Sequence, residues 1–289
     1  MHFRFHPPTF RAFVLGASLP ILAACSAVAG KSSETKPETS AKRKQPASSN
    51  ALAPNPAAPW NDSILAAIEK MPIGGGYSIG VDARDALLAG IAWEEDKPAL
   101  RPKSAQPSFC SGATYFVFLV TLAQQQRAGQ LILTPDVWRT LIVEGQADGQ
   151  GVWGRWNANG PGTARLFFET GIGTNFTDIK TAKPGDFMKI FWNESIGAAE
   201  KGHSVIYLGT NVSNGQETVS FWSSNQPGGY GGKEVPMSKI KRMVFSRLED
   251  PSKLADVAKL PRKDAFLASL EEKSVTPVAA AEAVGLKKW

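Results

Sequence analysis

Apolar residues gather in a few runs along the chain, and the longest run in the middle of the sequence predicts a buried helix. Pro107 disfavours helix at the residue before it, and Ser108 is a good N-cap, so the helix is expected to begin there with Cys110 in its first turn. The apolar residues that follow would cover every face of this helix: Tyr115, Phe116, Val117, Phe118, Leu119, Val120 and Leu122. We therefore expect it at the centre of the domain.

Shorter apolar runs farther along the chain predict strands. A turn at Pro184 and Gly185 leads into residues 187–192, a second run begins at His203, and a third begins at Glu217. Sequential strands joined by short polar segments are typical of an antiparallel meander. Together with the central helix, they predict the fold class α+β.

Two further segments carry local signals. Thr134 followed by Pro135 predicts the start of a short helix. Residues 149–162, rich in glycine and asparagine, predict a loop that exposes Trp153 and Trp156. These rings could bind a sugar or a peptide near a cleft, or they could pin a long loop to the body of the domain. Peripheral helices are expected over residues 251–289.

The first residues have the pattern of a secretory signal. Arg4 and Arg11 precede an apolar stretch over residues 12–24 that is too short to span a bilayer comfortably. The stretch ends in Leu-Ala-Ala-Cys, which resembles the lipobox of bacterial lipoproteins. This resemblance implies a signal peptide over residues 1–24 and a lipidated Cys25 at the mature N-terminus. Ordinary cleavage after Ala29 is the alternative.

The lipobox resemblance also implies a location. Ser26, directly after the cysteine, implies the outer membrane, with the protein facing the periplasm of a bacterial cell envelope. Residues 25–59 are rich in Ser, Ala, Pro and Lys without an apolar period, so they predict a flexible tether. The folded body is then expected over residues 60–250.

The charge of the chain excludes one class of partner. Lys and Arg exceed Asp and Glu by six over the whole sequence, but by only one when residues 1–59 are set aside. A nearly neutral body has no electrostatic footprint for nucleic acid, so we expect no nucleic-acid partner.

The chain has two cysteines and three histidines. Loss of the signal removes His2 and His6, and lipidation uses Cys25, which leaves Cys110 and His203 in the body. One residue of each kind can form neither an intramolecular disulfide nor a structural zinc site. Cys110 is therefore either a buried, inert thiol or a nucleophile.

The predicted position of Cys110 favours the nucleophile. Free backbone N–H groups and the positive end of the helix dipole lower the pKa of a thiol in the first turn. The same N–H groups can receive a developing oxyanion. His203, at the mouth of a strand packed against the helix, could serve as the base. No metal or organic cofactor is needed for this chemistry.

Three segments together resemble a known family. CSGATY at the helix start, KPGDFMKIFW and GHSVIYLG, in this order over about residues 104–226, resemble the NlpC-type cell-wall peptidases of the papain-like clan. The resemblance implies a papain-like fold, with Cys110 as nucleophile and His203 as base. It also implies that residues 129–183 are inserted. Phe109 stands where the family commonly has Asp, and Asp186 matches a turn element without a catalytic role.

Other site residues are suggested by position. Asn225 could orient the imidazole as in Cys-His-Asn sites, with Ser223 and Ser224 as rivals and a plain turn residue as the alternative. Ser111 and Gln106 are candidates for binding the oxyanion or the substrate, although a loop glutamine could equally be solvated.

The family resemblance implies a function. It implies a hydrolase that cleaves an amide bond in peptidoglycan stem peptides through an acyl-enzyme. One alternative is a noncatalytic lipoprotein that binds cell wall or a protein partner, in which Cys110 is buried and unreactive. Another is a thioester acyltransferase or esterase on the same scaffold.

Overall fold

The computed structural model describes residues 60–142 and 145–289. The predictions of a secretory signal, of lipidation at Cys25 and of a flexible tether concern residues that lie outside the described ones. None of the described helices is both long enough and apolar enough to cross a membrane.

An antiparallel sheet carries most of the described strands. Its strand order is β1-β9-β8-β7-β5-β10-β4. These strands are β1 (Gly74–Gly75), β4 (Gly173–Phe176), β5 (Phe187–Phe191), β7 (Gly202–Ser213), β8 (Gln216–Asn225), β9 (Gly229–Pro236) and β10 (Arg242–Leu248). Neighbouring strands β5, β7 and β8 pair antiparallel, so the predicted meander is confirmed.

Two small antiparallel pairs accompany the main sheet. β2 (Ile91–Glu94) pairs with β3 (Lys97–Leu100), and β6 (Ile196–Gly197) pairs with β11 (Ser274–Val275). The second pair joins the connection between β5 and β7 to the C-terminal segment.

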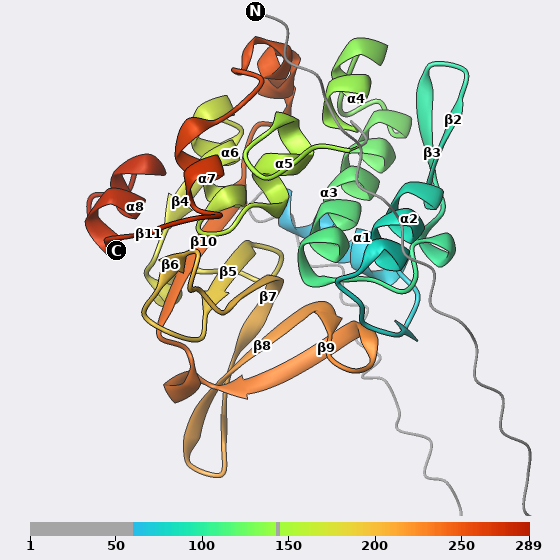
Figure 1. The fold of residues 1–289 in the computed structure, drawn as a ribbon. Helices are drawn as coiled ribbons and strands as arrows, with labels where there is room; N and C mark the ends of the chain where they lie inside the picture. The colour runs from blue at the N-terminus through green and yellow to red at the C-terminus, as the bar shows by residue number, and fades with distance from the viewer. Residues whose placement is uncertain (1–59, 143–144) are drawn as a thin grey trace, which may run out of the picture. The chain divides into compact units, whose positions relative to one another are not determined.

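Helices cover the sheet and complete a mixed α+β fold, as predicted. Figure 1 shows α1, α2 and α3 grouped together, with α6, α7 and α8 in a second group. The helices are α1 (Asn61–Glu69), α2 (Val81–Ala89), α3 (Cys110–Arg127), α4 (Pro135–Leu141), α5 (Gly151–Asn157), α6 (Gly162–Thr170), α7 (Ala265–Ser269) and α8 (Pro277–Ala283). Short 3-10 helices are η1 (Pro102–Ser104), η2 (Ile179–Thr181), η3 (Met237–Lys239) and η4 (Pro251–Lys259).

Helix α3 is the buried centre that the apolar run predicts. Every residue from 111 to 123 is buried, and α3 packs against β7 and β8. Its predicted N-cap is wrong by one residue, because Phe109 occupies that position and makes no side-chain capping bond. The Ser108 hydroxyl instead donates to Oγ of Ser224 at 2.8 Å, so a contact with β8 replaces the local cap. Cys110 is the first residue of the helix.

The predicted short helix after Thr134 is present as α4. The Thr134 hydroxyl accepts a hydrogen bond from the backbone N–H of Val137 at 3.4 Å, which caps the helix.

The predicted exposed loop over residues 149–162 is wrong. Its central part is α5, and its tryptophans are buried, with Trp153 9% and Trp156 2% exposed. Trp156 stacks on Phe118 of α3 with ring centroids 4.9 Å apart and meets Phe187 of β5 edge-on. The apolar area of these rings outweighs the loop-forming preference of the surrounding glycines and asparagines.

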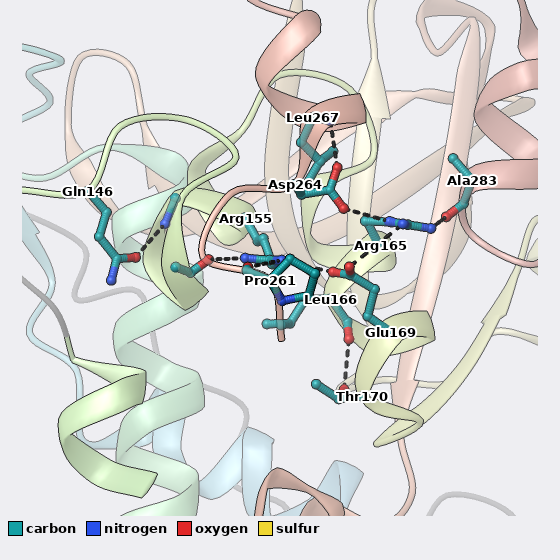
Figure 2. Close-up of polar contacts among 12 residues, drawn as sticks. Gln146, Arg155, Arg165, Leu166, Glu169, Thr170, Pro261, Asp264, Leu267 and Ala283 are labelled. Atoms are coloured by element: carbon teal, nitrogen blue, oxygen red, sulfur yellow. Dashed lines mark hydrogen bonds and ion pairs between the residues drawn. The ribbon is translucent and has the colours of Figure 1, made fainter. Parts of the chain in front are cut away.

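Ion pairs and hydrogen bonds of two arginines connect α5, α6 and the C-terminal segment (Figure 2). Arg155, with no exposed surface, donates to Glu169 Oε2 at 2.8 Å and to the Pro261 carbonyl at 2.7 Å. Arg165 donates to Asp264 Oδ2 at 2.9 Å, and Asp264 in turn caps α7. The segment after Pro251 contains the helices predicted there and is joined to the rest of the domain by polar as well as apolar contacts.

Candidate active site

Cys110 lies at the start of α3 with its thiol partly buried. Burial by itself raises the pKa of this thiol. A hydrogen bond and the charge of His203, the backbone N–H of Ser204 and the charge of Lys189 outweigh burial and lower the pKa to about 7. A substantial fraction of Cys110 is therefore thiolate at neutral pH, which is the nucleophilic form.

His203 reaches Cys110 from the second position of β7. The register of the sheet pairs His203 with Ile190 of β5, and the imidazole has the rings of Trp192 and Phe221 as neighbours. Their centroids are 6.3 Å and 5.6 Å from that of the imidazole. These aromatic neighbours limit the orientations of the imidazole.

Asn225, the last residue of β8, binds the other side of the imidazole. Its Oδ1 lies 3.1 Å from Nε2 of His203. Its Nδ2 donates to the backbone carbonyls of Ser223 and Gly231, at 3.2 Å and 2.8 Å. Since the amide nitrogen is used by two carbonyls, Oδ1 faces the ring and Nε2 must carry the proton. Nδ1 is then the ring nitrogen left to exchange a proton with Cys110.

The two serines that rival Asn225 are engaged elsewhere. Ser223 donates to the Ser204 carbonyl at 2.7 Å, and Ser224 donates to the Ser108 carbonyl at 3.0 Å. Both serines are fully buried in these contacts. The structure thus brings together Cys110, His203 and Asn225 from α3, β7 and β8.

Tyr77 is a neighbour of Cys110 that the sequence analysis missed. Burial, followed by the charge of Cys110 and a hydrogen bond to it, raises the pKa of this phenol to about 12. Tyr77 is therefore a protonated donor directed at the thiolate. The residues before it, Gly74 and Gly75, have φ near +80° and pair with β9, so their backbone conformation brings Tyr77 beside Ser108. Nothing in the local pattern identifies this residue.

A cleft of about 640 Å³ opens beside the nucleophile. Its lining includes Tyr77, Cys110, Ser111, Asp148, Trp153, Asn157, Asn159, Lys189, Glu200 and Ser204. The exposed side chains of Ile79 and Val81 form part of its rim. The lining of the cleft thus combines exposed apolar side chains with polar and charged residues near Cys110.

The remaining predicted site residues divide between the cleft and the interior. Ser111 lines the cleft, and its hydroxyl donates to Asn157 Oδ1 at 2.5 Å. Gln106 does not line the cleft; it lies against Gly75, and its Nε2 has no hydrogen-bond partner in the described part of the chain. The geometry therefore does not make Gln106 an oxyanion donor.

The two tryptophans also differ in position. Trp153 is among the residues that line the cleft, whereas Trp156 is not. Trp156 Nε1 donates to Thr114 Oγ1 at 3.1 Å inside the core. Trp153 is thus the tryptophan placed to contact a ligand in the cleft.

Within residues 60–142 and 145–289, no group of three or more His, Cys, Asp or Glu side chains is arranged to hold a metal ion. Comparison of the chain with protein-family models, curated proteins and solved structures gives no match.

Proposed function

We propose that the protein is a cysteine-dependent hydrolase that cleaves an amide bond in peptidoglycan stem peptides. The observation that carries the proposal is the continuous contact from the Cys110 thiol through the His203 ring to Asn225, beside an open cleft. A lowered thiol pKa, a base with a defined tautomer and a residue that orients the base are the parts that nucleophilic catalysis by cysteine requires.

The arrangement supports an acyl-enzyme mechanism. The Cys110 thiolate attacks the amide carbonyl carbon, a C–S bond forms, and the carbonyl electron pair moves to oxygen. Backbone N–H groups at the start of α3 and the Tyr77 hydroxyl can donate to this oxyanion. The C–N bond then breaks as the His203 imidazolium gives its Nδ1 proton to the leaving amine.

Water completes the cycle. His203 takes a proton from a water molecule, which attacks the thioester carbonyl and forms a second tetrahedral intermediate. Its collapse breaks the C–S bond, releases a carboxylic acid and restores Cys110. Asn225 keeps the ring oriented through both steps.

The substrate class rests on the resemblance of three sequence segments to NlpC-type cell-wall peptidases. The packing of α3, which carries the cysteine, on the antiparallel sheet, which carries the histidine, supports this papain-like reading of the fold. A lipid anchor at Cys25 would hold the domain at the outer membrane, where peptidoglycan is within reach.

The noncatalytic alternative requires a buried and unreactive Cys110. The position of Cys110 in the wall of an open cleft and its lowered pKa both favour a nucleophile instead. An acyltransferase or esterase would share the acyl-enzyme and differ only in the bond cleaved or in the acceptor.

Digestion of purified peptidoglycan tests the proposal. Wild-type protein should release fragments with new amine and carboxyl termini within the stem peptide, assigned by mass spectrometry, and Cys110→Ala should release none. Identical digests from both proteins would refute the proposed activity. Acyl transfer to an added amine or alcohol without hydrolysis would point to the acyltransferase.

A further inference from the structure

Asp148 is a partly buried charge in the cleft without a counter-ion. Across the described residues, no Lys, Arg or His nitrogen lies within 4.0 Å of its carboxylate. Asn157 Nδ2 donates to it over a long distance of 3.4 Å, and the backbone N–H of Asn159 also contacts it. The same Asn157 accepts from Ser111, the residue after the nucleophile. Hydrogen bonds therefore connect Asp148 to the immediate surroundings of Cys110.

The other charges of the cleft are paired or solvated. Lys189 Nζ lies 2.8 Å from Glu200 Oε1, and Glu200 Oε2 accepts from the backbone N–H groups of Gly160 and Gly197. Arg84 is exposed and pairs with Asp85, and Lys201 is exposed to solvent. Lys189 lies close enough to act on Asp148 electrostatically, but its own ion pair is with Glu200. Asp148 is thus the carboxylate of the cleft that is available to a ligand.

The C-terminal segment holds the turn that carries Asp148. The Gly149 carbonyl accepts from the backbone N–H of Asp264 at 2.7 Å, and Gly151 N–H donates to the Arg262 carbonyl at 2.9 Å. Gly149 has φ of +74°, and a Cβ there would lie 2.6 Å from the backbone nitrogen of Ala268. A substitution at Gly149 would therefore clash with α7. The position of Asp148 is set by backbone contacts, as a binding residue requires.

We propose that Asp148, supported by Asn157, forms a subsite for a protonated amine of the substrate beside Cys110. This inference rests on the proposed amide hydrolysis and deepens it: the substrate class is a peptide with a free amine close to the scissile bond. A protonated amine would donate a hydrogen bond to the Asp148 carboxylate and form the ion pair that this carboxylate lacks.

The electrostatics of the site agree with this assignment. Burial, and next the negative charge of Glu271, raise the pKa of Asp148 to about 6, while Lys189 and the two asparagines oppose the shift. The ionised form is thus destabilised in the empty cleft, and a cationic ligand would relieve this cost. Above about pH 6 the carboxylate is ionised and can bind an amine.

Charged thiol reagents test the subsite without requiring turnover. Cys110 in the full chain is treated with a neutral methyl methanethiosulfonate or with its trimethylammonium-ethyl and sulfonatoethyl analogues, and modification of the Cys110 peptide is followed by mass spectrometry. The rate with the cationic reagent is divided by the rate with the neutral reagent. Because both reagents react with the same thiolate, the thiolate fraction drops out of this ratio. At pH 7.5, Asp148→Asn should lower this ratio about fivefold. Glu272→Gln, which removes an exposed charge next to Glu271, should change it less than about twofold.

The pH profile of wild-type protein provides a second measurement that needs no variant. Its cationic preference should fall with a midpoint near pH 6 as Asp148 is protonated, and Glu271→Gln should move the midpoint to lower pH. Asp148→Asn, measured over the same pH range, serves as the reference for every other charge in the cleft. A flat wild-type ratio, an unchanged ratio in Asp148→Asn or a preference for the anionic reagent would overturn the subsite.

Substrate pairs separate the subsite from the proposed function. The experiment compares a stem peptide that the protein hydrolyses with the same peptide acetylated at its free amine. Acetylation should lower kcat/KM about tenfold for wild-type protein and have little effect for Asp148→Asn. Equal hydrolysis of both peptides by wild-type protein would refute the subsite and leave the hydrolase intact. Charge-selective labelling without hydrolysis of any peptide would refute the hydrolase and leave the subsite intact.

Discussion

Nε2 of His203 and Oδ1 of Asn225 lie 3.1 Å apart, and this contact determines which nitrogen of the imidazole accepts a proton. The amide nitrogen of Asn225 is held by two backbone carbonyls, so the amide cannot turn without losing both hydrogen bonds. Nδ1 is thereby the ring nitrogen left to exchange a proton with Cys110.

Replacing Asn225 should therefore cost less activity than replacing His203. Asn225→Ala removes one orienting hydrogen bond, and we expect kcat to fall about tenfold with KM nearly unchanged. In the proposed mechanism His203 carries the proton, so His203→Ala should lower kcat/KM on the order of 10² to 10⁴-fold. Steady-state kinetics on a stem peptide would show this order, with thermal melts as the folding control. Equal losses in the two variants would contradict the orienting role of Asn225.

The rate of Cys110 alkylation should report the lowered pKa. Iodoacetamide labelling of native protein should reach half of its maximal rate near pH 7, because the folded protein holds the thiolate at that pH. His203→Ala should move the midpoint to higher pH, because burial raises the pKa of the thiol and the hydrogen bond and charge of His203 that lower it are lost. A midpoint at the ordinary thiol value in wild-type protein, or one unaffected by His203→Ala, would show that His203 does not activate the thiol.

The two tryptophans of α5 should respond differently to truncation. Trp156→Ala leaves a cavity among Phe118, Phe187 and Tyr115, and the free energy of unfolding should fall by about 3 to 5 kcal/mol. Trp153→Phe keeps most of the apolar contact, so its main effect should be on KM. Urea unfolding and steady-state kinetics separate the two results. A Trp156→Ala variant of wild-type stability would contradict the packing described for α5.

The buried ion pair between Arg155 and Glu169 (Figure 2) should contribute more to the free energy of unfolding than an exposed ion pair. Arg155→Ala leaves Glu169 without its closest partner inside the domain, and the expected loss of unfolding free energy is about 3 to 5 kcal/mol. Arg139→Ala breaks the exposed pairs with Asp96 and Asp136 and should cost less than about 1 kcal/mol. Urea unfolding of both variants provides the comparison, and similar losses would show that burial of Arg155 adds nothing.

Asp148 should make the stability of the protein depend on pH. Between its usual pKa of 3.8 and about 6, the folded protein binds a proton that the unfolded chain releases, so this residue lowers stability as pH rises through that window. Asp148→Asn lacks the effect. Its stability relative to wild-type protein should rise by on the order of 1 kcal/mol from about pH 3.5 to 7, after allowance for solvent screening. A constant difference in unfolding free energy across this range would argue against a raised pKa.

Local sequence determined the helix and the strand that carry Cys110 and His203. The apolar run after Cys110 is long enough to require a buried helix, and the apolar run that begins at His203 predicts a strand, so α3 and β7 follow from short-range pattern. The count of one cysteine and one histidine in the body then suggested Cys110 and His203 as partners before any geometry was known.

Tertiary structure decided which residues surround Cys110 and His203. Tyr77 and Asp148 are 33 and 38 residues from Cys110 in the sequence, and no local pattern indicates that they share a cleft with it. The central part of the exposed loop expected over residues 149–162 is instead the helix α5, whose Trp156 is buried against rings from α3 and β5. Helices and turns follow from interactions between near neighbours, whereas burial, pKa and the shape of a cleft depend on contacts between distant segments, which local sequence pattern does not specify.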